Sequence, residues 1–212
     1  MIALENVVGR KKFDAFLQKY ISTYSFQSLT TEGFLTFLEQ ELPKAVAQVD
    51  VNAWIFTPGI PESAKEFESA LYNQVEDALK AYTNGPRPSA EETKGWNARQ
   101  KFIFMRSLPE TISLEDCAYF EALFDIKETK NTTTRNAFYL IAVRSGYQDA
   151  LQRIEDHVCK IGAMYSLSLL FRTMVATDWS KEYARPFFEK ARDGYHPITA
   201  KIIAGILDEA GL

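Results

Sequence analysis

Apolar side chains recur along most of this chain at intervals of three and four residues, the period of one face of an α-helix. The first such face predicts a helix formed by Phe13, Phe16, Leu17, Tyr20 and Ile21. A second helix is expected after Thr31, a residue type that caps helix N-termini, and its face is formed by Phe34, Leu35, Phe37 and Leu38. No stretch shows the alternation of apolar and polar residues that predicts a half-buried strand.

The helical pattern is interrupted at residues 52–61, which read Asn-Ala-Trp-Ile-Phe-Thr-Pro-Gly-Ile-Pro. Two prolines and a glycine in this stretch argue against a regular helix. We therefore predict a helical segment at residues 1–55, a Pro/Gly linker at residues 56–66 and a main helical domain at residues 67–212.

The helical period resumes after the predicted linker. It marks a third apolar face formed by Phe67, Leu71, Val75, Ala78, Leu79 and Tyr82, which ends before Asn84-Gly85-Pro86. Further helices are predicted at residues 93–107, 114–124, 133–145, 147–160, 163–177, 180–192 and 197–209. Ser113 precedes Asp116 in capping-box spacing, and Pro197 suits a first helical turn.

Short connections between successive helices predict antiparallel neighbours. The expected fold class is all-α, a two-layer antiparallel helical array that forms a right-handed α-α superhelix of the HEAT or armadillo kind. A period of ~40 residues is not evident, so the sequence does not establish a regular repeat protein.

Composition excludes several classes of function. The net charge of −4 is spread along the 212 residues, so no basic stripe predicts nucleic-acid binding. No apolar run approaches the ~20 residues of a membrane span, and the first eight residues do not read as an export signal. Cys117 and Cys159 lack C-x-x-C spacing and are interpreted as reduced core residues of a cytoplasmic protein, with a disulfide between them as the alternative.

The candidate metal ligands are sparse. A zinc site needs three converging protein ligands, whereas this chain has only two histidines, His157 and His196, which are far apart. His157 and Cys159 are two residues apart on a predicted helix and therefore face different ways. We predict structural roles for both histidines and no metal site in this chain.

Three pairs of neighbouring acidic residues are candidates for acid/base chemistry. Glu91-Glu92, Glu115-Asp116 and Glu155-Asp156 each lie within or just before a predicted helix, where solvated faces and first-turn acids are typical. Because no serine elbow, phosphate-binding glycine loop or Cys-His arrangement accompanies them, we predict no catalytic residue here. The stripe formed by Tyr119, Phe120, Leu123 and Phe124 is interpreted as core, with a peptide groove as the alternative.

Three stretches resemble the zinc aminopeptidases of the leukotriene A4 hydrolase type. They are residues 13–20 with 26–31, residues 51–61, and residues 194–200, which read Gly-Tyr-His-Pro-Ile-Thr-Ala. Their order and separation are similar to those in the family's C-terminal third. The resemblance implies that residues 1 to about 55 close a catalytic domain and that a helical superhelix follows. It also implies that the zinc ligands, general-base glutamate and transition-state tyrosine belong to a more N-terminal part of a parent enzyme.

The resemblance also implies a substrate-binding segment. The family has a Gly-Arg-x-Lys segment at a helix start, whose two cations hold the free carboxylate of the substrate. The matching residues here are Gly162-Ala163-Met164-Tyr165, so Gly162, Ala163 and Tyr165 occupy substrate-binding positions from which both cations are lost. A parent enzyme is then expected to depend less on the C-terminal charge of short peptides.

The leading hypothesis is a non-catalytic C-terminal domain that walls the active-site cleft of such a peptidase and limits access to peptide N-termini. Zinc is expected only in the parent's catalytic domain, and the partners are that domain and, through the parent, a peptide substrate. The isolated chain is expected to expose an apolar face and to self-associate. The alternative is a stand-alone helical scaffold that binds a protein or peptide partner.

Overall fold

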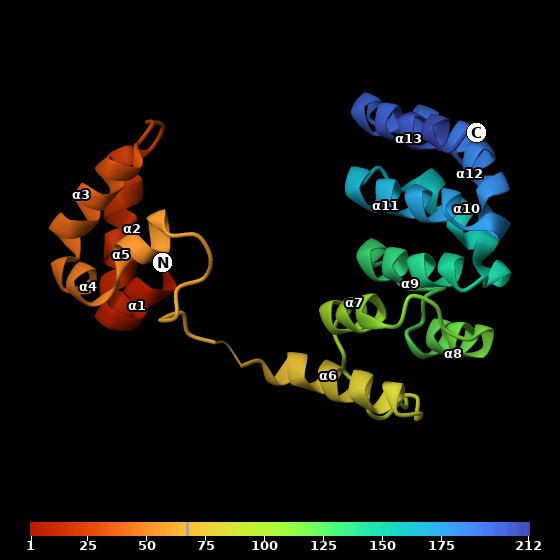
Figure 1. Ribbon diagram of the computed structural model, residues 1–212, viewed down its shortest axis with the longest axis horizontal. Helices are drawn as coiled ribbons and strands as arrows, with labels where there is room; N and C mark the ends of the chain where they lie inside the picture. Colours follow the sequence, from red (N-terminus) through yellow and green to blue (C-terminus); the bar gives the residue numbers. More distant parts are fainter. Residues whose placement is uncertain (67) are drawn as a thin grey trace. The chain divides into compact units, whose positions relative to one another are not determined.

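The computed structural model describes residues 1–66 and 68–212, and every regular element in these ranges is a helix. The all-α fold class predicted from the sequence is therefore confirmed. The chain divides into two compact units between Phe67 and Glu68 (Figure 1). Phe67, which the sequence assigned to a helical face, lies outside the described residues. None of the described helices is long and apolar enough to cross a lipid bilayer.

The first unit contains α1 (Ile2–Val8), α2 (Arg10–Tyr24), α3 (Thr31–Glu41), α4 (Pro43–Gln48) and α5 (Val51–Phe56). Its core consists of Leu4, Phe13, Phe16, Phe37, Leu38, Leu42 and Ala45. The rings of Phe16 and Phe37, 5.6 Å apart, join α2 to α3. The predicted helices are present, but Ile21 is 61% exposed and does not belong to the buried face of α2.

Two local predictions for the first unit are wrong. The cap of α3 is Thr30 and not Thr31, because the Thr30 hydroxyl accepts a hydrogen bond from the Gly33 N–H at 3.1 Å. Residues 51–56 form α5, although the Pro/Gly content of residues 52–61 predicted no helix there. Proline disfavours the helical conformation of the residue before it, and Thr57 before Pro58 is extended. The helix ends at Phe56, before this restriction applies.

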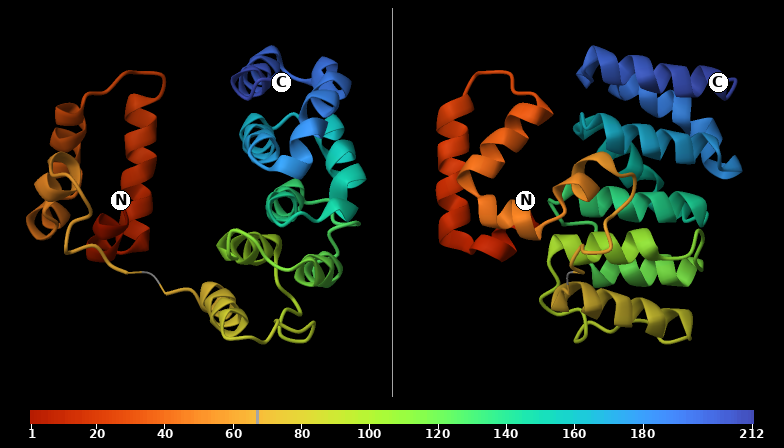
Figure 2. Two further views of the ribbon diagram at one scale, coloured as in Figure 1. Left: turned by 45° about the vertical axis from the view of Figure 1, so that its right-hand side comes forward. Right: turned by 60° about the vertical axis from the view of Figure 1, so that its left-hand side comes forward.

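The second unit is a two-layer stack of antiparallel helices, as predicted. Its helices are α6 (Ala70–Thr83), α7 (Ala98–Ser107), α8 (Leu114–Leu123), α9 (Thr132–Arg144), α10 (Leu151–Lys160), α11 (Met164–Val175), α12 (Asp178–Ala191) and α13 (Pro197–Glu209). One layer stacks α7, α9, α11 and α13 in that order, and α8, α10 and α12 lie in the other (Figures 1 and 2). This stacking brings together helix ends that are far apart in the sequence.

The core of the second unit is centred on α9. Residues 136–143 of this helix are buried without a break, because α7 and α11 cover it within its own layer and α8 packs against it from the other. Phe120 of α8 and Phe124, its C-cap, are each 1% exposed, and the partly buried Tyr119 and Leu123 pack against the same core. The interpretation of that aromatic stripe as core is confirmed.

Two predicted helices begin later than expected. The helix predicted from residue 93 begins at Ala98, because Asn97 and Gln100 form a capping box that fixes the start of α7. The helix predicted from residue 147 begins with a short 3₁₀ turn, Gln148–Ala150, and becomes α-helical only at Leu151.

Candidate functional site

The predicted substrate-binding segment lies where α10 ends and α11 begins. Ala163 occupies the N-cap position of α11 and has no side-chain oxygen that could cap the helix. Within the described ranges, the backbone N–H groups of Met164, Tyr165 and Ser166 donate no hydrogen bond. Tyr165 is 75% exposed, and Gly162 is exposed as well. The helix start is therefore free to meet a ligand.

A cavity of about 130 Å³ lies beside this helix start. It is lined by Phe102 and Arg106 from α7, Asn136 and Leu140 from α9, and Tyr165 and Leu169 from α11, among other residues. Of the three predicted positions, Tyr165 lines the cavity, whereas Gly162 and Ala163 do not. The lining includes a guanidinium group and no carboxylate, so the local charge favours an anionic ligand.

Arg106 and Asn136 are cavity residues that the sequence analysis did not single out. Arg106 lies in the last turn of α7, is exposed, and forms no ion pair with another described residue. Asn136 is 6% exposed, and its Oδ1 atom has no hydrogen-bond partner. An amide that opens the apolar run Ala137–Val143 is a sequence signal that could have revealed Asn136. No sequence signal marks Arg106, because its place in the cavity depends on the packing of three helices.

The two histidines have separate structural positions. His157 is 1% exposed in α10, and its ring packs edge-on against Tyr139 at 5.1 Å. His196 is the N-cap of α13, where its Nδ1 atom accepts a hydrogen bond from the Ile198 N–H at 3.2 Å. Among residues 1–66 and 68–212, no group of three or more His, Cys, Asp or Glu side chains is arranged to hold a metal ion.

The two cysteines are free thiols, as interpreted from the sequence. Cys117 is buried in α8, and burial raises the pKa of its thiol to about 11. Cys159 is exposed, so the expectation that both cysteines belong to the core is wrong for this residue.

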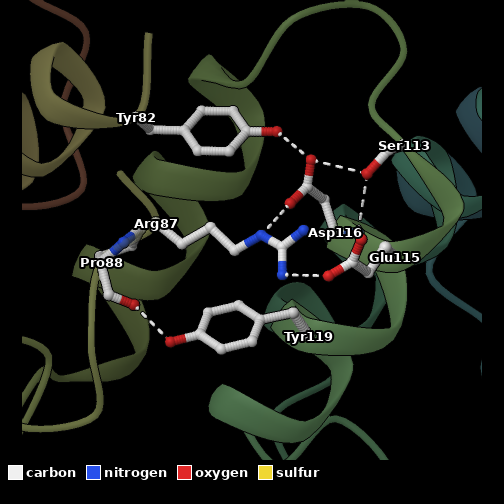
Figure 3. Close-up of polar contacts among 7 residues, drawn as sticks. All are labelled: Tyr82, Arg87, Pro88, Ser113, Glu115, Asp116 and Tyr119. Carbon is white, nitrogen blue, oxygen red and sulfur yellow. Dashed lines mark hydrogen bonds and ion pairs between the residues drawn. The ribbon is translucent and has the colours of Figure 1, made fainter. Parts of the chain in front are cut away.

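Of the pair Glu115 and Asp116, the first is exposed to solvent and the second belongs to a partly buried hydrogen-bond network. Both residues lie in the first turn of α8, as predicted. The side chain of Asp116 is only 14% exposed, so the prediction that both acids face solvent is wrong for this residue. Its carboxylate accepts hydrogen bonds from the Tyr82 hydroxyl at 2.9 Å, from the Ser113 hydroxyl at 2.8 Å and from the Arg87 guanidinium (Figure 3). This network fastens α6 and the loop after it to α8.

The electrostatics of Asp116 follow from these contacts. Burial alone would raise the pKa of its carboxyl, but the hydrogen bonds from Ser113, Tyr82 and Arg87 outweigh burial and hold that pKa below its usual value. Burial and the bond to Asp116 raise the pKa of Tyr82 to about 12. A carboxylate and a phenol with pKa values displaced in these directions are poor proton donors and acceptors near neutrality, so the network is structural.

The remaining acidic pairs also have structural contacts. Glu92 accepts a hydrogen bond from the Ser89 N–H at 2.7 Å and caps a turn. Glu155 forms an ion pair with Lys190 at 2.8 Å, which joins α10 to α12 and lowers the pKa of the Glu155 carboxyl.

We expect Asp116→Ala to lower the free energy of unfolding by about 2 kcal/mol, because it removes several hydrogen bonds to one partly buried charge. Glu115→Ala is the matched control: Glu115 is 80% exposed and pairs with the same Arg87 at 2.9 Å, so a loss of about 0.5 kcal/mol or less is expected. Urea unfolding followed by circular dichroism measures both changes. Equal losses in the two variants would contradict the structural role assigned to Asp116.

Comparison with known proteins defines the class of this helical stack. Residues 96–207, more than half of the chain, match the family described as "Leukotriene A4 hydrolase, C-terminal". The chain therefore belongs to the family of leukotriene A4 hydrolase C-terminal domains. The resemblance noted in the sequence is confirmed.

Individual relatives agree with this assignment. Leucine aminopeptidase 2 of Pyricularia oryzae is 32% identical over 98% of this chain and 36% of the relative. A leukotriene A-4 hydrolase homolog of Botryotinia fuckeliana is 26% identical over 92% of this chain and 31% of the relative. The solved structure of native yeast LTA4 hydrolase has the same fold, with a TM-score of 0.78 at 20% identity over 96% of this chain and 37% of that structure. The chain thus spans about a third of the length of these relatives.

Proposed function

We propose that this chain is the non-catalytic C-terminal part of a zinc aminopeptidase and that its helical stack walls the active-site cleft. The observation that carries the proposal is the similarity of nearly the whole chain to about a third of a leucine aminopeptidase. In this proposal, zinc and the bond-breaking residues belong to the catalytic domain of the parent, and the wall admits peptides only by their free N-termini.

The surface of the first unit supports a catalytic domain as the partner. Large apolar side chains are exposed there, namely Met1, Ile2, Trp54, Ile55, Phe56 and Ile60. Met1 and Trp54 also line two hollows of about 200 and 540 Å³, whose other lining residues all belong to this unit. An apolar surface of this kind is typical of a protein–protein interface. We propose that it packs against the catalytic domain in the parent and causes self-association when the chain is isolated.

The complete reading frame that contains residues 1–212 provides the test. We expect the full-length protein to bind zinc stoichiometrically and to release amino acids from aminoacyl anilides but not from N-acetylated peptides. The isolated chain is expected to do neither, because it lacks the proposed catalytic domain. Metal analysis and an anilide assay on both proteins measure this difference. Zinc-dependent turnover by the isolated chain, or cleavage of internal peptide bonds by the full-length protein, would contradict the proposal.

A further inference from the structure

A hollow of about 390 Å³ lies between α6 and the segment of residues 86–96 that follows it. Its volume falls within the roughly 300–1,000 Å³ that is typical of ligand sites. All of its lining belongs to residues 74–96, so the hollow lies within the second unit. It is lined, among other residues, by Asp77, Ala78, Ala81, Pro88, Glu92 and Trp96.

Trp96 brings an unpaired hydrogen-bond donor to this hollow. The residue is only 7% exposed, and its Nε1 atom has no hydrogen-bond partner among the described residues. The indole ring is held between Phe104 at 5.7 Å and Phe124 at 6.0 Å, so the donor has a fixed place. An indole N–H can only donate, and native proteins seldom leave a buried donor unpaired. The hollow therefore suits a ligand that carries an acceptor.

Carboxylates give the hollow an excess of negative charge. Asp77 is exposed and forms no ion pair with another described residue. Glu92 accepts a backbone hydrogen bond that lowers the pKa of its carboxyl, so it is charged at neutral pH. The lining also includes the guanidinium of Arg87, but Glu115 and Asp116 both pair with it (Figure 3). The local charge therefore favours a cationic ligand.

A basic side chain that belongs to a polypeptide meets both requirements. Its ammonium or guanidinium group can pair with Asp77 and Glu92, and its methylene stem can lie along the apolar surface of Ala78, Ala81 and Pro88. Neither cation can accept a hydrogen bond from Trp96. The acceptor must therefore be a backbone carbonyl beside the basic side chain, a group that a free polyamine lacks.

We propose that this hollow binds an arginine or lysine side chain of a partner protein. Asp77 and Glu92 receive the cation, and the Nε1 atom of Trp96 donates a hydrogen bond to a carbonyl oxygen of the partner's backbone. This interaction goes beyond the proposed function, because it needs neither zinc nor a catalytic domain.

The test uses the 212-residue chain and three probes. N-acetyl-arginine N-methylamide carries a cation and peptide carbonyls, the matching citrulline amide keeps the carbonyls without the charge, and propylguanidinium keeps the cation without a carbonyl. Dissociation constants come from nuclear magnetic resonance titration of ¹⁵N-labelled protein. We expect the arginine probe to bind about tenfold more tightly than the citrulline probe and about fivefold more tightly than propylguanidinium, because it alone forms both kinds of bond.

The indole signals report the hydrogen bond directly. The chain has three tryptophans, and Trp96→Phe identifies the signal of Trp96 by its loss. The arginine probe is expected to move the Trp96 indole proton downfield, and propylguanidinium is not. Trp179 is an internal control, because its Nε1 atom already donates to the Val143 carbonyl oxygen at 2.8 Å and its signal is expected to stay in place.

Substitutions assign the binding to this hollow. Asp77→Asn is expected to remove most of the preference for arginine over citrulline. Glu76→Gln is the matched control, because it also removes one charge from α6 but Glu76 does not line the hollow. It is expected to leave every dissociation constant unchanged. Asp77→Asn changes only an exposed side chain, so the dissociation constants still decide if Trp96→Phe fails to fold.

The proposal is overturned if the arginine probe binds no more tightly than either of the other two, if the Trp96 indole signal does not move, or if Asp77→Asn and Glu76→Gln have the same effect. These outcomes are separate from those that test the proposed function, because neither zinc nor turnover is measured. A full-length protein with zinc and anilide activity, together with a 212-residue chain that binds no basic probe, would sustain the cleft-wall proposal and exclude this binding site.

Discussion

Phe104→Ala is expected to lower the free energy of unfolding of the second unit by about 4 kcal/mol, the usual cost of deleting a buried aromatic ring. Phe104 is 0% exposed in α7. Its ring packs edge-on against Phe120 at 5.3 Å, Trp96 at 5.7 Å and Phe124 at 5.7 Å. Alanine would leave a cavity among three large rings that are themselves held by other contacts. Urea unfolding at neutral pH, followed by far-ultraviolet circular dichroism, measures the loss.

Ile198→Ala is the control for this prediction. It also replaces a large apolar residue of the second unit by alanine, but Ile198 is 58% exposed on α13. A change within about 0.5 kcal/mol is expected. Similar losses in the two variants would show that the aromatic cluster around Phe104 is not the centre of the core.

Helices with a complete amphipathic face and clear end signals were predictable from the sequence. The bounds of α13 match the prediction, because Pro197 and the capping His196 fix its start. The short helices α1 and α4 were missed, since six or seven residues contain too few turns to show a period. Residues 93–97 were predicted as the start of the helix at 93–107, but the capping box at Asn97 and Gln100 starts α7 later. Local hydrogen bonds, and not the apolar period, therefore set the start of a helix such as α7.

The candidate site was predictable only in part. The position of Gly162 to Tyr165 at a helix start followed from resemblance to a family, and the structure places Tyr165 at a cavity. The partners of Tyr165 in that cavity come from α7 and α9, two helices that lie well before it in the sequence. No local pattern encodes which helix ends meet, so Arg106 emerged only from the stacking of the layers. The resemblance identified which cations are missing but gave no indication of Arg106.

Acidification is expected to destabilise the second unit through His157. Burial, and secondarily the charge of Arg135, lowers the pKa of His157 to about 4 from its usual 6.5. The histidine is therefore neutral in the folded state, while the unfolded chain takes up a proton below pH 6.5. This stabilisation is fully present above pH 6.5 and is lost as the pH falls towards 4. At pH 4 the loss amounts to about 3 kcal/mol.

His157→Phe isolates this contribution, because phenylalanine keeps an aromatic ring against Tyr139 but cannot take up a proton. Urea unfolding of both proteins at pH 7 and pH 4 measures the free energies of unfolding. Carboxylates such as Asp116 titrate equally in the two proteins, so their effect cancels in the comparison. The variant is expected to lose about 3 kcal/mol less than the parent chain between these pH values. Equal losses in the two proteins would mean that His157 takes up its proton without unfolding, and would refute the assignment of acid sensitivity to its burial.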